Sequence, residues 1–113
     1  MLIVVISSAL AILAQGQDKR TADYALAVRC AGLTQAASEL EGSESRYGRA
    51  LADSALFWTL TAFQAATAQD ITYAAAEAEQ RVARIQSVRR LNSSEAQARR
   101  QLTECRQKTP RLN

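Results

Sequence analysis

The sequence predicts an all-α protein: a small four-helix up-down bundle closed by one disulfide and preceded by a signal peptide. Three observations support this class, namely an apolar N-terminal segment, a helix-forming composition after it, and two distant cysteines. Of the 97 residues from Gln17 onward, 20 are alanine, and 37 more are Leu, Arg, Gln or Glu. These residues favour helices. Runs of β-branched residues, which favour strands, occur only in the N-terminal segment.

The N-terminal segment has the features of a secretory leader. Residues 2–13 read LIVVISSALAIL and carry no charge. This length matches the apolar region of a signal peptide and falls short of the roughly 20 residues needed to span a bilayer. Small residues at Ala14 and Gly16 predict cleavage before Gln17, giving a signal peptide over 1–16 and a helical domain over 17–113. No basic residue precedes the segment, so a retained N-terminal helix is the alternative.

The first predicted helix begins after the N-cap Thr21 and runs to about Glu41, where Gly42 ends it. Its apolar residues recur at alternating steps of four and three: Leu26, Cys30, Leu33, Ala37 and Leu40.

The second predicted helix opens after Ser43 or Ser45 and continues to about Ala68. It is apolar on two faces, which predicts a central position in the bundle. One face consists of Tyr47, Leu51, Ala55, Trp58, Ala62 and Ala65, and the other of Leu56, Leu60 and Phe63. Trp58, with Phe57 and Phe63, could form an exposed patch, but in a chain so poor in large apolar residues we expect a core role.

The third helix is predicted from about Ile71 to Leu91 with Asp70 as its cap. Its apolar stripe is Ala74, Ala78, Val82, Ile85, Val88 and Leu91. Asn92 and Glu95 have capping-box spacing, which predicts a fourth helix over about 94–107. This cap also explains the Asn92-Ser93-Ser94 glycosylation pattern. Short turns favour antiparallel neighbours, and a three-helix array with a broken second helix is the alternative.

Cys30 and Cys105 are the only cysteines, and in an exported protein such a pair predicts a disulfide. Because the core is rich in alanine, the bond matters for stability. In the chain-entropy model, closing so long a loop contributes roughly 4 kcal/mol. Two free thiols are the alternative, and the spacing is not that of a C-x-x-C redox pair.

The chain contains no histidine, which excludes histidine-dependent triads and zinc sites with His ligands. Its one methionine is Met1, so the helical domain offers neither a histidine nor a methionine as an axial ligand for haem. Glu39 with Glu41, and Glu77 with Glu79, are two residues apart and point to different sides of a helix. We therefore expect no catalytic, metal-binding or cofactor-binding residues. Glu77 and Arg81 are spaced as a surface ion pair.

Charge is unevenly placed along the chain. Residues 17–80 hold five basic and nine acidic groups, and residues 81–113 hold nine basic and two acidic groups. An up-down bundle would largely cancel this imbalance, because each end collects both signs. We expect one end to hold Glu39, Glu41, Glu44, Arg89 and Arg90, and the other to hold Asp18, Asp23, Asp70, Glu77, Glu79, Arg106, Lys108 and Arg111. The residues left as a possible face for an anionic partner are Arg84, Arg99 and Arg100.

These features predict a small periplasmic or secreted protein with a non-enzymatic interaction or accessory role toward a protein partner. We expect no nucleic-acid partner, because no aromatic residue interleaves the arginines of 81–111. Membrane association is expected only if residues 1–16 are retained, and the oligomeric state is left open. The first alternative is a membrane-attached subunit of a larger complex that keeps its apolar helix. The second is a hydrolase acting through carboxylates.

Overall fold

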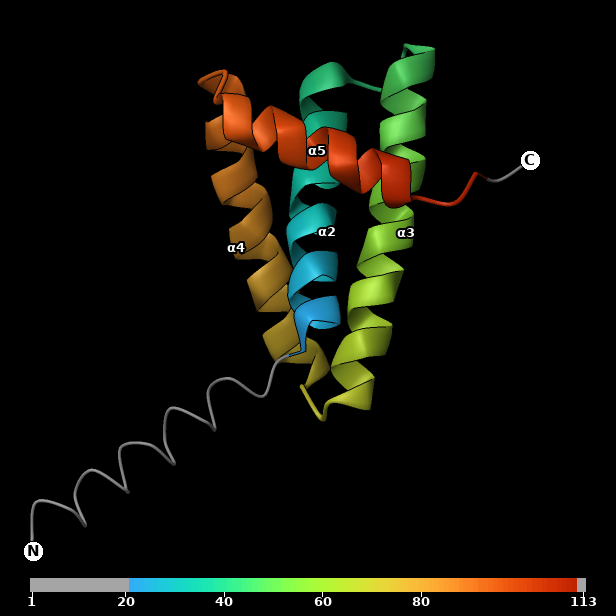
Figure 1. Ribbon diagram of the computed structural model, residues 1–113, viewed down its shortest axis with the longest axis vertical. Coiled ribbons are helices and arrows are strands. Elements are labelled where there is room, and N and C mark those ends of the chain that lie inside the picture. Colours follow the sequence, from blue (N-terminus) through green and yellow to red (C-terminus); the bar gives the residue numbers. More distant parts are fainter. Residues whose placement is uncertain (1–20, 112–113) are drawn as a thin grey trace, which may run out of the picture.

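The computed structural model describes residues 21–111, so the predicted signal peptide over 1–16 and its cleavage site lie outside the described residues. The described part forms four helices and no strand: α2 (Ala22–Glu41), α3 (Arg46–Ala68), α4 (Tyr73–Asn92) and α5 (Ala96–Lys108). The predicted all-α class with four helices is confirmed. Figure 1 shows α2 between α3 and α4, with α2 and α4 running in one direction and α3 in the opposite one, and α5 lying across them near the end where α2 stops.

The first two helices begin and end where the sequence predicts. The Thr21 hydroxyl accepts a hydrogen bond from the Tyr24 amide at 3.2 Å, and the Ser45 hydroxyl accepts one from the Gly48 amide at 2.9 Å. Both are N-cap bonds that satisfy otherwise unpaired amides of the first turn. Gly42 ends α2 with a positive φ of 83°, a conformation that glycine adopts without steric cost.

The predicted caps of the last two helices are wrong. Asp70 lies in the α3–α4 turn with a φ of 57°, and the Thr72 hydroxyl caps α4 instead by accepting from the Ala75 amide at 3.1 Å. Asn92 is still part of α4, and α5 has Glu95 at its N-cap position without a side-chain capping bond. Glu95 is engaged elsewhere, because its carboxylate pairs with Arg90 at 2.9 Å.

The central helix is α2, and the prediction that the second helix is central is wrong. Helix α2 packs against α3, α4 and α5, whereas α3 and α4 make few contacts with each other. Small residues on several faces of α2 allow this close packing from different sides, and Ala27, Ala31, Gly32 and Ala36 are all buried. Helix α3 is continuous, which excludes the array with a broken second helix. Much of its second apolar face has no neighbour among residues 21–111, since Leu56 and Leu60 are 60% and 52% exposed, whereas Phe63 packs against Tyr73 of α4.

Most of the predicted apolar stripe of α4 also faces away from the core, and Leu91 is the member that packs against it. Val82 and Ile85 are exposed, and the buried positions of this helix are Ala76 and Ser87. The reason is a close approach of two helix backbones. A Cβ atom at Gly32 of α2 would lie 2.7 Å from the carbonyl carbon and the Cβ of Ala83. Only small residues fit such an interface, so the larger branched side chains of α4 are turned outward.

The main core lies where α5 crosses α2 and α3. Buried Leu33, Leu51, Trp58 and Leu102 pack there with several alanines. Cys30 and Cys105 form the predicted disulfide, with their Cα atoms 5.4 Å apart. The predicted core position of Trp58 is also confirmed, whereas Leu40 and Tyr47, at the ends of their stripes, are exposed.

Candidate functional site: a groove between α3 and α4

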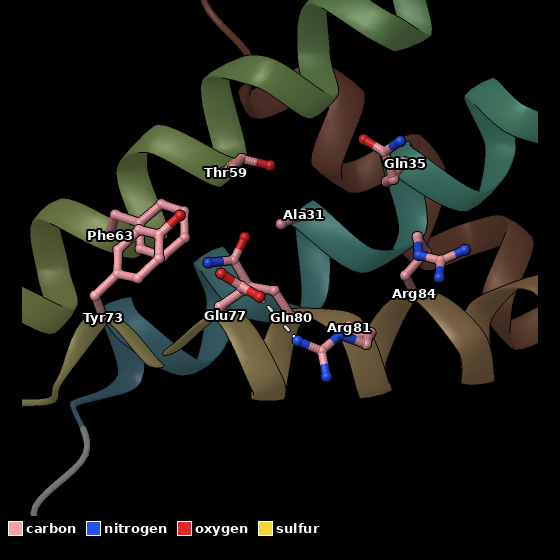
Figure 2. Close-up of a pocket in the computed structure, with 9 residues that line it drawn as sticks. All are labelled: Ala31, Gln35, Thr59, Phe63, Tyr73, Glu77, Gln80, Arg81 and Arg84. Atoms are coloured by element: carbon pink, nitrogen blue, oxygen red, sulfur yellow. Dashed lines mark hydrogen bonds and ion pairs between the residues drawn. The ribbon is translucent and has the colours of Figure 1, made fainter. Parts of the chain in front are cut away.

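Helices α3 and α4 diverge on either side of α2 and leave a pocket of about 400 Å³ between them. Ala31 of α2 forms its floor (Figure 2). The preceding residue, Cys30, is bonded to α5, which has no residue in the pocket lining. We call this pocket the α3–α4 groove. It is lined by Ala31, Gln35, Thr59, Phe63, Tyr73, Glu77, Gln80, Arg81 and Arg84.

One end of the groove is aromatic. The rings of Phe63 and Tyr73 are stacked, with centroids 4.7 Å apart and planes 10° from parallel. Phe63 is half-buried, but Tyr73 is 67% exposed although it stands in the first turn of α4. The stack therefore presents a rigid aromatic surface with a phenol hydroxyl, a combination common in protein interfaces.

The α4 wall of the groove carries paired charges. Arg81 binds Glu77 at 2.8 Å, which confirms the predicted surface ion pair, and Arg84 binds Glu39 of α2 at 3.2 Å. All four side chains are at least one-third exposed, so these pairs are individually worth little for stability. Both guanidinium groups stay accessible to a bound partner.

Gln80 stands between the aromatic end and the arginines, and Figure 2 shows its side chain rising from α4 near Ala31. Its Nε2 atom is buried and has no hydrogen-bond partner among residues 21–111. A buried polar group without a partner costs about 1–3 kcal/mol. An acceptor on a bound ligand would remove this cost, which makes Gln80 the candidate hydrogen-bonding residue of the groove.

The chemistry of the groove favours binding. Its lining holds one carboxylate, Glu77, which is already paired with Arg81, whereas a carboxylate-dependent hydrolase requires two. Across residues 21–111, no cluster of three or more Cys, Asp or Glu side chains is placed to hold a metal ion. Within the same residues, no helix is both long and apolar enough to cross a membrane.

A second pocket, of about 450 Å³, lies between α2 and α4 and is lined in part by Tyr24, Glu79 and Arg90. Three of its polar groups already have partners. The Tyr24 hydroxyl donates to Glu79 at 3.2 Å, and Arg90 donates to Glu95 and to Gln101, which lie outside the pocket. Unlike the α3–α4 groove, this pocket has no aromatic stack in its lining.

The arginines predicted as an anionic-partner face do not gather at one place. Arg84 lines the α3–α4 groove, whereas Arg99 and Arg100 are exposed on α5. Arg99 donates to the Ser94 hydroxyl at 3.0 Å, and Glu95, four residues before Arg99, is bound to Arg90. A single pocket cannot use all three.

The predicted cancellation of charge between the two ends is wrong. Arg106 lies over the Tyr47 ring, 4.7 Å from its centroid, in the first turn of α3. It therefore sits near the end predicted to hold Glu39, and away from Asp70. The cause is the crossing direction of α5, which keeps its basic residues toward the end where α2 and α4 stop (Figure 1). Basic groups thus outnumber acidic groups at one end, where Glu41, Glu44 and Glu95 also lie, and the other end keeps Asp23 and Asp70.

The groove could not be predicted from the sequence, because the residues that line it form no recognisable motif or spacing. Tyr73 and Gln80 lie seven residues apart on one helix and acquire meaning only when Phe63 and Ala31 come beside them. The one available signal was the apolar face formed by Leu56, Leu60 and Phe63, whose last member lines the groove. Comparison with protein-family models, curated proteins and solved structures finds no match.

Proposed function

We propose that this chain is an exported, non-enzymatic interaction protein that binds a protein partner in the α3–α4 groove. The observation that carries the proposal is the buried, unpartnered Nε2 of Gln80 in a groove that ends in the exposed Phe63–Tyr73 stack. A peptide carbonyl is the acceptor that an amide donor of this kind binds. Tyrosine and arginine, both present in the lining, are also enriched where proteins bind each other.

A periplasmic or secreted location is part of this proposal. The Cys30–Cys105 bond supports it, because disulfides persist in oxidising compartments and are rare in the reducing cytosol. The apolar segment over 2–13 supports it further.

Processing gives a direct test of export. N-terminal sequencing and intact mass of the protein recovered after expression in its own host are expected to show a chain that begins at Gln17 or within a few residues of it. An intact chain beginning at Met1 in the membrane fraction would instead favour the membrane-attached subunit.

The groove can be tested by site-specific photo-crosslinking in the native host. A photoreactive phenylalanine analogue at position 73 is expected to capture a discrete protein partner. The matched control is the same analogue at Gln97, an exposed position on α5 outside the groove, where we expect no such product.

Gln80→Ala separates binding from folding. Removal of a buried, unpaired amide is expected to leave the melting temperature unchanged or to raise it. The same change should weaken capture of the partner about five- to tenfold, the value of one buried hydrogen bond of about 1–1.4 kcal/mol. Equal capture from positions 73 and 97, or capture unaffected by Gln80→Ala, would contradict the groove as the binding site.

A further inference from the structure

The outward face of α3 forms a second surface, distinct from the floor and α4 wall of the groove. Six residues recur along it at alternating steps of four and three, the spacing of a helix-pairing seam. We call them the α3 strip: Arg49, Asp53, Leu56, Leu60, Phe63 and Thr67. Phe63 is half-buried against Tyr73 of α4 and the other five are exposed, so within residues 21–111 no helix covers the strip except at Phe63. Its centre is apolar and its ends are polar.

We propose that the α3 strip pairs with the α3 strip of a second copy of this chain, in antiparallel orientation about a two-fold axis. In such a pair, residues equally far from the midpoint of the strip face each other. With the midpoint at residue 58, Leu56 of each copy lies opposite Leu60 of the other. These two side chains, the most exposed leucines of residues 21–111 at 60% and 52%, then become mutually buried.

The charges of α3 favour this partner and this orientation. The first turn of the helix carries exposed Arg46 and Arg49, which exposed Glu44 and Asp53 flank, and the turn after the helix holds exposed Asp70. Arg46 and Asp70 each lie twelve residues from residue 58. An antiparallel pair therefore brings Arg46 of each copy to Asp70 of the other, whereas a parallel pair would place each of these residues beside its own counterpart.

The charge distribution of the whole domain acts in the same direction. The end of the molecule where α5 crosses holds more basic than acidic groups, although Glu41, Glu44 and Glu95 also lie there, and the other end keeps Asp23 and Asp70. Antiparallel association places the basic end of one copy beside the acidic end of its neighbour. The excess of basic groups at one end of each copy is then offset by the acidic groups of the other copy.

Sedimentation equilibrium of the chain as isolated after export provides the test, over about 1 μM to 1 mM at low salt. The expected result is a reversible monomer–dimer equilibrium. Leu60→Arg places a charge at the centre of the seam and is expected to raise the dissociation constant by at least about tenfold. The matched control is Val82→Arg on α4, because Val82 is 53% exposed and lies outside the strip. It should leave the dissociation constant within about twofold.

A charge reversal tests the orientation. Added salt of about 0.5 M should weaken the wild-type dimer by screening the attraction between Arg46 and Asp70 of the partner copy. In Arg46→Glu the same salt should strengthen association, because it screens a repulsion. Circular dichroism is expected to show unchanged helix content, since Leu60 and Arg46 are exposed. A wild-type protein that stays monomeric throughout, or a dimer insensitive to Leu60→Arg, would overturn the proposal, whatever binds in the groove.

Discussion

Replacing Cys30 and Cys105 together with alanine is expected to lower the free energy of unfolding by about 2–5 kcal/mol. The bond joins residues 75 positions apart and so ties α5 to the middle of α2. In the unfolded chain this cross-link removes many conformations, which is worth about 4 kcal/mol in the chain-entropy model. The native core offers little to compensate for its loss, because most of its buried apolar residues are alanines.

Removing the disulfide should destabilise α5 before it unfolds the rest of the domain. Helix α5 has 13 residues and buries only Ala98, Leu102 and Cys105. A helix of this length is marginal in water without tertiary contacts. Hydrogen exchange of the double variant should therefore accelerate most in α5, while amides of α2 stay protected at low temperature.

Urea unfolding followed by circular dichroism measures the stability change, with the reduced wild-type protein as the matched control. Reduction breaks the disulfide without replacing either cysteine. The reduced wild-type protein and the double variant should therefore lose similar amounts of unfolding free energy. A change below about 1 kcal/mol, or equal exchange in α2 and α5, would show that packing alone holds α5.

The helices themselves were predictable because their signals are local. Thr21, Ser45 and Gly42 act within one helical turn, and the structure has the first two helices at the expected bounds. The disulfide was predictable for a different reason, since a chain with two cysteines allows one pairing. The all-α class depends on these local signals and on composition.

The choice of buried face was not predictable in the same way. Side-chain size favoured Val82 and Ile85 as the core of α4, but Gly32 brings the α2 backbone so close that Ala83 and Ser87 face it instead. A hydrophobic pattern identifies the apolar face of a helix and cannot show that a neighbour accepts only small residues there. The groove followed from this packing, because α4 turns Tyr73, Gln80 and Arg84 toward the space beside α2.

Trp58→Ala is expected to cost about 3–5 kcal/mol of unfolding free energy, the range for a buried tryptophan. Trp58 is 5% exposed and lies in the core where α5 crosses α3. Its indole N–H donates to the Cys105 carbonyl at 3.2 Å and to the Thr109 hydroxyl at 3.0 Å. The side chain therefore connects α3 to the end of α5 through both apolar contact and hydrogen bonds.

Trp58→Phe is the matched control, because it keeps an aromatic ring and removes the indole N–H. We expect it to cost much less than Trp58→Ala. The Thr109 hydroxyl still donates to the Cys105 carbonyl at 2.8 Å in the absence of the indole, so neither group loses every partner. Urea unfolding of both variants supplies the comparison, and equal losses would mean that ring packing contributes little to this contact.

The same residue tests whether α5 docks as a unit. If the disulfide and Trp58 hold the same helix, their effects should not add, because a detached α5 has already lost its contacts with Trp58. Trp58→Ala should then cost less in the variant lacking Cys30 and Cys105 than in the oxidised protein. Trp58 is the only tryptophan, so its emission reports this docking directly and should shift to longer wavelength when the disulfide is reduced. Additive losses with unshifted emission would show that α5 stays bound to α3 without the disulfide.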